Sequence, residues 1–247
     1  MQIRESIIAY LKRNNLEKLD IKSVLFDMDG VLFDSMPFHA SSWEKCISEI
    51  GIECTAEEFY LYEGQTGYHT INYIINREYN RDATEEEKTN IYKKKSGYFE
   101  LCGEAPVMIG ADEILDKTIK NNLIPVLVTG SGQKSLLDKL AHCFPGVFSK
   151  ERMITAHDVK YGKPNAEPYL KGLDKTGAHK NEAFIVENAP LGVRAGANAK
   201  IFTIAVTTGP IPKDVLYKEG ADLVFSSMKE LADNFEELIY EMKNIKI

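Results

Sequence analysis

The sequence is poor in the features that mark several large classes of protein. Its four cysteines are widely spaced and form no Cys-x-x-Cys pair, which indicates reduced, packed thiols in a cytoplasmic protein. No apolar run approaches the ~20 residues needed to cross a bilayer. The net charge of −7 argues against nucleic acid or an anionic membrane as the main partner. We therefore expect neither a nucleic-acid-binding nor a membrane protein. The four cysteines are Cys46, Cys54, Cys102 and Cys143.

The composition is nevertheless that of a well-packed globular protein. The 247 residues are 44% apolar and include 12 tyrosines and 11 phenylalanines, enough for one large domain or a domain with an insert. Residues 1–20 mix apolar and charged side chains at helical spacing, which predicts an amphipathic helix packed on the core; a dimer contact is the alternative. We expect a monomer or a weak homodimer.

After residue 20, short apolar segments alternate with helical ones. This alternation predicts an α/β fold with a Rossmann-like, doubly wound parallel sheet. The predicted strands are 23–27, 125–129, 152–155, 183–187, 201–206 and 223–225. The predicted helices of this part are 111–121, 134–142, 167–175, 191–199 and 228–243.

Between the first two strands the alternation stops and only helices are predicted. Pro37 lies where the chain enters this stretch and Pro106 where it leaves, which suits a small inserted domain over the strand ends. The sequence therefore predicts a helix at 1–20, a catalytic core at 21–35 and 107–247, and a helical cap at 36–106. The predicted cap helices are 38–50, 56–61, 68–79 and 84–101.

The first strand ends in two aspartates separated by one residue, Asp27 and Asp29, followed by Gly30. Alternate residues of an extended chain point the same way, so the two carboxylates can converge. The carboxyl end of a strand is where open α/β sheets place their sites. Two neighbouring carboxylates are costly without a cation or a shared proton, so the pair suggests chemistry. The alternative is a solvated acidic turn.

Three later strand ends or loops carry polar residues of complementary kinds. Thr129-Gly130-Ser131 combines a hydroxyl with exposed amides, as an anion cradle does, although for this segment alone a helix cap preceded by a flexible turn is the favoured interpretation. Lys163, fixed before a proline, offers a cation to a transferring phosphoryl group; a surface lysine is the alternative. Glu187-Asn188 offers oxygen ligands suited to Mg²⁺, or an Asx turn.

In order, these elements resemble the motifs of the haloacid dehalogenase-like superfamily of phosphotransferases. The likeness covers roughly residues 21–230, and the helical insert is similar to the cap of the β-phosphoglucomutase-like branch. The resemblance implies Asp27 as a nucleophile that forms an aspartyl-phosphate and Asp29 as general acid and base. It implies that Thr129 and Lys163 bind the phosphoryl group, with Gly130 and Ser131 beside them.

The same resemblance implies Mg²⁺ as the cofactor. Its ligands would be Asp27, the backbone carbonyl of Asp29, and the pair Glu187 and Asn188. Sugar-phosphate relatives often carry two acids at the last position, so Asn188 removes one negative charge from the expected metal site.

Two glycines stand where the sugar mutases carry cations for a second phosphate. Gly67 replaces an arginine and Gly132 replaces a lysine, so a bisphosphate intermediate would be poorly held. Glu63, on the cap loop, adds a carboxylate instead. We expect Glu63 to meet Mg²⁺, directly or through water, with Gln65 reaching the substrate when the cap closes; a surface acid is the alternative.

These departures, and the resemblance of several segments to the pyrophosphatases of the superfamily, favour inorganic pyrophosphate as the substrate. A sugar-phosphate phosphatase or a β-phosphoglucomutase is the alternative enzyme, and an inactive phosphate-binding regulatory module the alternative outside catalysis. His39, near the hinge, is expected either to donate to Asp29 or to be a buried structural histidine. The only partner expected is a small phosphorylated molecule.

Overall fold

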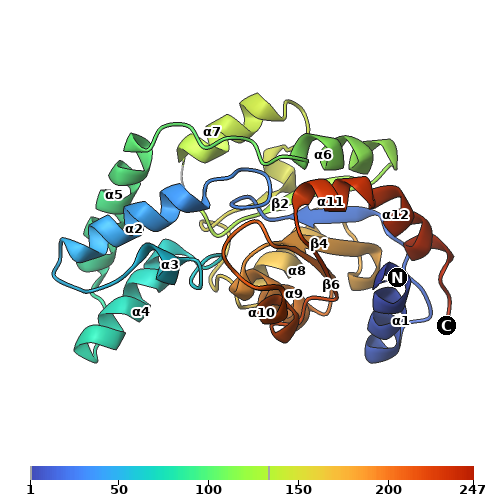
Figure 1. Cartoon of the computed structure of the whole chain (residues 1–247), viewed down its shortest axis with the longest axis horizontal. Coiled ribbons are helices and arrows are strands. Elements are labelled where there is room, and N and C mark those ends of the chain that lie inside the picture. The colour runs from blue at the N-terminus through green and yellow to red at the C-terminus, as the bar shows by residue number, and fades with distance from the viewer. Residues whose placement is uncertain (1, 133) are drawn as a thin grey trace.

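The predicted strands form one parallel sheet (Figure 1). In the computed structural model, which describes residues 2–132 and 134–247, the strand order is β3-β2-β1-β4-β5-β6. Each neighbouring pair is parallel, so all strands present their carboxyl ends at one edge. The α/β, Rossmann-like fold class is therefore confirmed. The strands are β1 (Ser23–Phe26), β2 (Ile124–Val128), β3 (Met153–Ile154), β4 (Ala183–Glu187), β5 (Phe202–Val206) and β6 (Leu223–Phe225).

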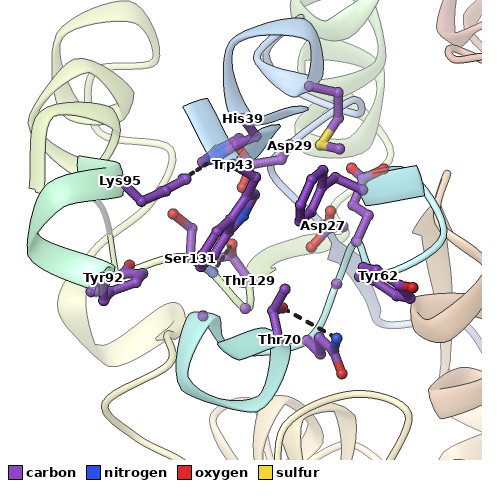
Figure 2. Close-up of a pocket in the computed structure, with 17 residues that line it drawn as sticks. Asp27, Asp29, His39, Trp43, Tyr62, Thr70, Tyr92, Lys95, Thr129 and Ser131 are labelled. Atoms are coloured by element: carbon purple, nitrogen blue, oxygen red, sulfur yellow. Dashed lines mark hydrogen bonds and ion pairs between the residues drawn. The ribbon is translucent and has the colours of Figure 1, made fainter. Parts of the chain in front are cut away.

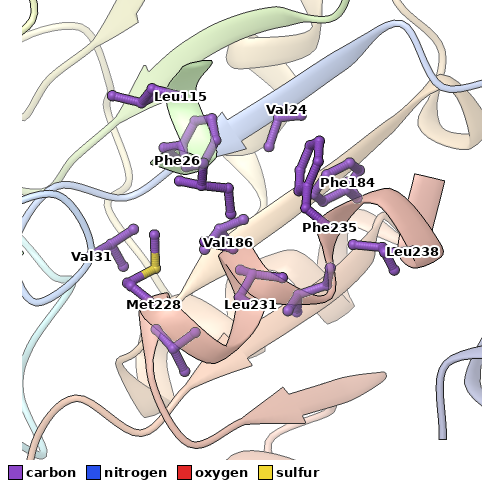
Figure 3. Close-up of a cluster of buried hydrophobic side chains, with 14 of the residues drawn as sticks. Val24, Phe26, Val31, Leu115, Phe184, Val186, Met228, Leu231, Phe235 and Leu238 are labelled. Carbon is purple, nitrogen blue, oxygen red and sulfur yellow. The ribbon is translucent and has the colours of Figure 1, made fainter. Parts of the chain in front are cut away.

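Helices cover both faces of the sheet because alternate strand residues point to opposite sides. Phe26 and Phe184 pack against Phe235 and its neighbours on one face (Figure 3). Leu25 and Ile185 pack on the other face. The first face is covered by α6 (Ala111–Lys120), α11 (Met228–Asp233) and α12 (Phe235–Asn244), and the second by α8 (Glu167–Asp174) and α9 (Pro190–Ala199). Helix α7 (Lys134–Cys143) follows β2.

The amino-terminal helix α1 (Gln2–Asn14) packs on the core beside α12 and β6. Its apolar face is fully buried at Ile7 and Leu11. The Tyr10 ring meets Phe202 edge-on, with 5.2 Å between ring centroids, and Arg13 pairs with Asp222 at 2.5 Å. These contacts account for the amphipathic pattern of residues 1–20.

Four helices over the strand ends form the cap, α2 (Met36–Ser48), α3 (Ala56–Phe59), α4 (Gly67–Tyr79) and α5 (Glu85–Leu101). They share a hydrophobic cluster of their own around Trp43 and Phe59, and they lie to one side of the sheet (Figure 1). The two connections to the core run side by side and pair through Phe33 and Val107. That residues 36–106 move as a unit stays a prediction.

Two predictions of helices were wrong. Residues 228–243 form two helices, because Asn234 leaves helical geometry (φ −95°, ψ 5°) and its side-chain amide donates to the Glu230 carbonyl at 2.8 Å. A short helix α10 (Lys213–Lys218) was not predicted. Short 3₁₀ turns occur at Lys150–Arg152 and Lys180–Glu182. Within residues 2–132 and 134–247, none of the helices has both the length and the apolar character needed to cross a membrane.

Candidate active site

Asp27 and Asp29 converge at the end of β1 and line one cavity of about 60 Å³. The turn that brings them together depends on Gly30, whose φ is +77°. A Cβ atom at Gly30 would lie 2.0 Å from the Asn188 side-chain nitrogen. Glycine is therefore required here both by the backbone conformation and by the approach of a second site residue.

The Lys163 ammonium group bridges Asp27, at the end of β1, and Glu187, at the end of β4. Its ammonium group donates to Asp27 Oδ1 at 2.6 Å, to Glu187 Oε1 at 2.6 Å and to the Val128 carbonyl at 3.0 Å. The side chain is 1% exposed, so the predicted alternative of a surface lysine is excluded. All three ammonium protons are in hydrogen bonds.

The ionisation of Asp27 reflects crowding by other acids. Burial raises the pKa of Asp27, and Lys163 opposes that rise, while the nearby Glu187 and Asp29 carboxylates add to it; the net pKa is about 8. Burial lowers the pKa of the Lys163 ammonium, but Asp27 and then Glu187 outweigh it and raise that pKa. Without a further cation, the site holds more acid groups than its lysine can balance.

Glu187 and Asn188, at the end of β4, differ in how their oxygens are occupied. The Glu187 carboxylate accepts bonds from Lys163 and Tyr169 on one oxygen and from the Asn188 and Ala189 amides on the other. Asn188 Oδ1 is buried with no hydrogen-bond partner in the part of the chain that the structure describes. A buried acceptor without a donor is destabilising, so this oxygen lacks a positive partner.

The donor set fits a magnesium ion. The unpaired oxygen of Asn188 lies among carboxyls, and hard oxygen ligands are those that Mg²⁺ prefers. Among the described residues, no group of three or more His, Cys, Asp or Glu side chains forms a metal cage by itself. Mg²⁺ commonly uses one or two carboxylates together with substrate phosphates rather than a complete protein cage, so the geometry remains compatible with it.

Glu63 reaches this site from the loop between α3 and α4. Its carboxylate accepts a bond from Asn188 Nδ2 at 3.1 Å, and the residue is 8% exposed. Burial, followed by the charge of Asp27, raises the pKa of Glu63 well above its usual value. The alternative of a surface acid is therefore excluded, and the cap adds a fourth acid to Asp27, Asp29 and Glu187.

The loop that carries Glu63 is seated on core glycines. A Cβ atom at Gly130 would lie 2.3 Å from the Gly64 carbonyl oxygen, and one at Gly162 would lie 2.9 Å from the Thr66 methyl group. A Cβ atom at Gly209 would lie 3.3 Å from the Tyr60 ring. Three core loops thus present bare backbone to the cap loop, which lets it lie directly over the strand ends.

Asp29 is held by a chain of hydrogen bonds that starts in the cap (Figure 2). Lys95 Nζ lies 2.5 Å from His39 Nδ1, and His39 Nε2 lies 3.0 Å from Asp29 Oδ1. With Nδ1 accepting from Lys95, the ring proton is on Nε2 and is donated to Asp29. Ser35 donates to the same oxygen of Asp29 at 2.5 Å.

The charges along this chain follow from burial. Burial lowers the pKa of Lys95 to about 7, although Asp29 opposes the change. Burial and then Lys95 also lower the pKa of His39. Burial by itself raises the pKa of Asp29, but His39 and Ser35 outweigh it, so the net pKa is lowered. Asp29 is therefore ionised in this arrangement.

Tyr92 of α5 lies beside Gly67 and Gly132, the two glycines expected to stand where the mutases carry cations, and His157 Nε2 would lie 3.1 Å from a Cβ atom at Gly132. A Cβ atom at Gly67 would lie 2.3 Å from the Tyr92 ring, and one at Gly132 would lie 3.4 Å from its hydroxyl. The ring also lines the cavity with Asp27 and Asp29 (Figure 2). An aromatic side chain therefore lies beside both glycines.

The remaining predicted residues line the cavity. The Thr129 hydroxyl accepts from the Ser131 amide at 2.9 Å and so shapes the Gly130 turn, while Gln65 donates to Thr70 at 3.2 Å. All eleven predicted side chains or turn residues are thus brought into one site. They are Asp27, Asp29, His39, Glu63, Gln65, Thr129, Gly130, Ser131, Lys163, Glu187 and Asn188.

Three further residues escaped the sequence reasoning: Tyr92, Lys95 and Tyr169. Lys95 had a signal, since Ile91, Lys95 and Phe99 follow one another at four-residue spacing on the buried face of α5. A lysine on the apolar face of a helix indicates a function, because lysine is almost never fully buried unless its charge is paired. Tyr92 and Tyr169 had none, because buried tyrosines are common in cores.

Comparison with known proteins decides the family. Residues 24–206 match the model of the haloacid dehalogenase-like hydrolases. This chain belongs to that family. A structure described as "Putative beta-phosphoglucomutase from Bacteroides vulgatus" is 52% identical, with a TM-score of 0.95, and the match covers 98% of this chain and 99% of that one. The chain therefore lies in the β-phosphoglucomutase-like branch.

Curated relatives of the chain are phosphatases of different kinds. Hexitol phosphatase A of Escherichia coli is 28% identical over 85% of this chain and 93% of its own length. A protein of Clostridium perfringens described as "Putative pyrophosphatase PpaX" is 26% identical over 88% of this chain and 99% of its own. This haloacid dehalogenase-like protein is thus a member of a family of phosphatases and phosphomutases that act on small phosphorylated molecules and generally use Mg²⁺.

Proposed function

We propose that this chain is an Mg²⁺-dependent inorganic pyrophosphatase that acts through an aspartyl-phosphate on Asp27. The observation that carries the substrate is the small size of the cavity lined by Asp27, Asp29, Glu63 and Tyr92. The cavity of about 60 Å³ has room for roughly four or five waters. A second phosphate group fits such a space better than a hexose does.

In the first step an Asp27 carboxylate oxygen attacks the nearer phosphorus of pyrophosphate, and the bond from that phosphorus to the bridging oxygen breaks. The leaving phosphate takes the electron pair. Lys163, bonded to Asp27 at 2.6 Å, holds the nucleophile in place and offsets charge on the transferring group. The Thr129 hydroxyl, which accepts from the Ser131 amide, can donate its own proton to the same oxygens.

In the second step Asp29 accepts a proton from water, whose oxygen attacks the phosphorus and breaks its bond to Asp27. His39 and Ser35 keep Asp29 ionised and fix its direction, as a general base requires. An ionised Asp29 supplies no proton to the leaving group of the first step. This state supports pyrophosphate, because hydrogen phosphate is a much weaker base than the alkoxide of a sugar and so leaves without being protonated.

The residues that would hold Mg²⁺ are Asp27, the Asp29 carbonyl, Asn188 and Glu63. Glu187, which the sequence also offered as a ligand, already accepts four hydrogen bonds and would instead hold the Asn188 backbone in place. When bound, the ion neutralises charge on the phosphate oxygens. The unpaired Asn188 Oδ1 supports a cation at this point. Glu63 then supplies the negative charge that Asn188 lacks, and it does so from the cap, so that the closed cap and a complete ligand set coincide.

The relatives supply a second candidate, a sugar phosphatase or β-phosphoglucomutase. The 52% identical structure is described as a putative mutase, and Hexitol phosphatase A is a sugar-alcohol phosphatase by name. Gly67 and Gly132 weigh against a mutase, since a bisphosphate intermediate must be held in two orientations and a second cation site is absent from both positions.

The test is phosphate release with Mg²⁺ from pyrophosphate, glucose 1-phosphate, glucose 6-phosphate, sorbitol 6-phosphate and glycerol 1-phosphate. We expect kcat/KM for pyrophosphate to exceed that for every ester by at least tenfold. Equal or higher values for any of the esters would refute the pyrophosphatase. Conversion of β-glucose 1-phosphate to glucose 6-phosphate would establish the mutase instead.

A further inference from the structure

Tyr169 is a fully buried residue of α8 that packs with Leu25 and Ile185 in a hydrophobic cluster. Its hydroxyl donates to Glu187 Oε1 at 2.7 Å, and the residue is 0% exposed. None of the steps described above uses it.

The bond from Tyr169 completes the surroundings of Glu187. An ionised carboxylate accepts about four hydrogen bonds, and Glu187 has four donors, two of them backbone amides on Oε2 at 3.0 and 3.1 Å. On Oε1 the donors are Tyr169 and Lys163. A Cβ atom at Gly192 would lie 1.8 Å from Oε1, so backbone blocks the remaining side.

Tyr169 also touches Lys163 directly. The Lys163 ammonium lies 5.0 Å from the centre of the Tyr169 ring, within the range of a cation–π contact. The lysine therefore rests on the ring while it shares Glu187 with the hydroxyl. Removing the hydroxyl alone would leave the ring and its packing in place.

We propose that Tyr169 is a positioning residue: its hydroxyl fixes the Glu187 carboxylate, which in turn holds the Lys163 ammonium and the backbone of Asn188, the residue expected to bind Mg²⁺. The inference rests on the phosphoryl-transfer site of the proposed function but not on its substrate. Outer partners that orient metal ligands typically change metal affinity or activity by about 10- to 100-fold when they are removed. A hydroxyl bond to a buried charge belongs to the stronger class of hydrogen bonds.

The deciding variant is Tyr169→Phe, and Tyr10→Phe is its matched control. Tyr10 is also 0% exposed, and its hydroxyl donates to the Lys200 carbonyl at 2.9 Å, far from the site in sequence and on the α1 side of the core. Both variants lose one buried hydroxyl and keep the ring. Thermal melting measures the structural cost of each.

The first readout is Mg²⁺ binding by calorimetry with no substrate present. We expect Tyr169→Phe to weaken the Mg²⁺ Kd about tenfold and Tyr10→Phe to leave it unchanged. The second readout is turnover of pyrophosphate and of p-nitrophenyl phosphate, where kcat should fall about tenfold in Tyr169→Phe with KM within twofold. The Glu187→Gln background should abolish the effect of Tyr169→Phe on Mg²⁺ binding.

A loss of melting temperature in Tyr169→Phe equal to that in Tyr10→Phe, with wild-type Mg²⁺ affinity and kcat, would overturn the proposal. Additive effects of Tyr169→Phe and Glu187→Gln would overturn it too, because Tyr169 would then act independently of Glu187. Failure of the wild-type protein to hydrolyse pyrophosphate would refute the pyrophosphatase alone, since the calorimetric comparison needs no substrate.

Discussion

The side-chain amide of Asn188, in the core, donates to the Glu63 carboxylate, in the cap, over 3.1 Å. The same amide leaves its oxygen buried and unpaired. One residue of the core thus binds the cap with its nitrogen and offers its oxygen to the site. The cap loop and the candidate site are thereby joined through a single side chain.

Replacing Glu63 should show what the carboxylate of the cap loop contributes to Mg²⁺ dependence and to substrate preference. Glu63→Ala is expected to lower kcat/KM for pyrophosphate at least tenfold, since a charged ligand is lost, and to raise the ratio of hexose-phosphate to pyrophosphate activity as space opens. Mg²⁺ titrations of activity and the substrate panel measure both. Glu57→Ala is the control, because Glu57 is an exposed acid of the adjacent helix α3. Unchanged Mg²⁺ dependence and substrate preference would contradict the role given to Glu63.

Substitutions of Asp27 and of Asp29 should block different steps of the reaction. Asp29→Asn is expected to lower turnover about 10²- to 10⁴-fold, the usual contribution of a general base, and to accumulate phosphoryl-enzyme, since attack by Asp27 needs no proton. Asp27→Asn should lose turnover without accumulating the adduct. Intact-protein mass spectrometry after mixing with pyrophosphate and Mg²⁺ distinguishes them. Labelling of Asp27→Asn would place the nucleophile elsewhere.

Lys95 should make stability depend on pH. Its folded pKa, about 7, lies below the ordinary value of 10.5, so between these values the unfolded chain holds a proton that the folded chain lacks. Stability then rises with pH across that window. Below about pH 7 the cost of burying the charge is present in full, on the order of 4 kcal/mol by the size of the shift.

Lys95→Met removes this dependence. Its stability relative to wild type should be most favourable at or below pH 7 and should decline towards pH 10. Urea unfolding at pH 6, 8 and 10 measures the difference, with the exposed Lys93→Met as control. A difference that does not change with pH would show that Lys95 keeps an ordinary pKa.

The contact between the cap loop and the core glycine Gly130 should be sensitive to a single added methyl group. Gly130→Ala places a Cβ atom 2.3 Å from the Gly64 carbonyl, so the cap loop must move, and displacements of about 1 Å can cost 10²-fold in rate. Gly97→Ala, in open space within α5, should keep full activity and gain about 1 kcal/mol of stability. Kinetics and melting of both variants test this. Full activity of Gly130→Ala would mean that the close seating is dispensable.

Local sequence determined most of the fold because its signals are short-range. The apolar runs before Asp27, Thr129 and Glu187 specify buried strands, and parallel strands place their ends at one edge whatever lies between them. The point at which a helix is interrupted was harder to predict from the sequence. At Asn234 the interruption depends on a side-chain hydrogen bond to the Glu230 carbonyl, which the spacing of apolar residues does not indicate.

The residue types of the site were likewise set by the sequence, while their connections were decided by the tertiary structure. Asp27, Asp29, Lys163 and Glu187 were visible because each stands at the end of a strand or in a rigid loop. The bond between Glu63 and Asn188 spans 125 positions, and the chain from Lys95 to His39 spans 56. Only packing of the cap on the core brings such partners together and buries them, and so places Lys95 and Tyr92 at the candidate site.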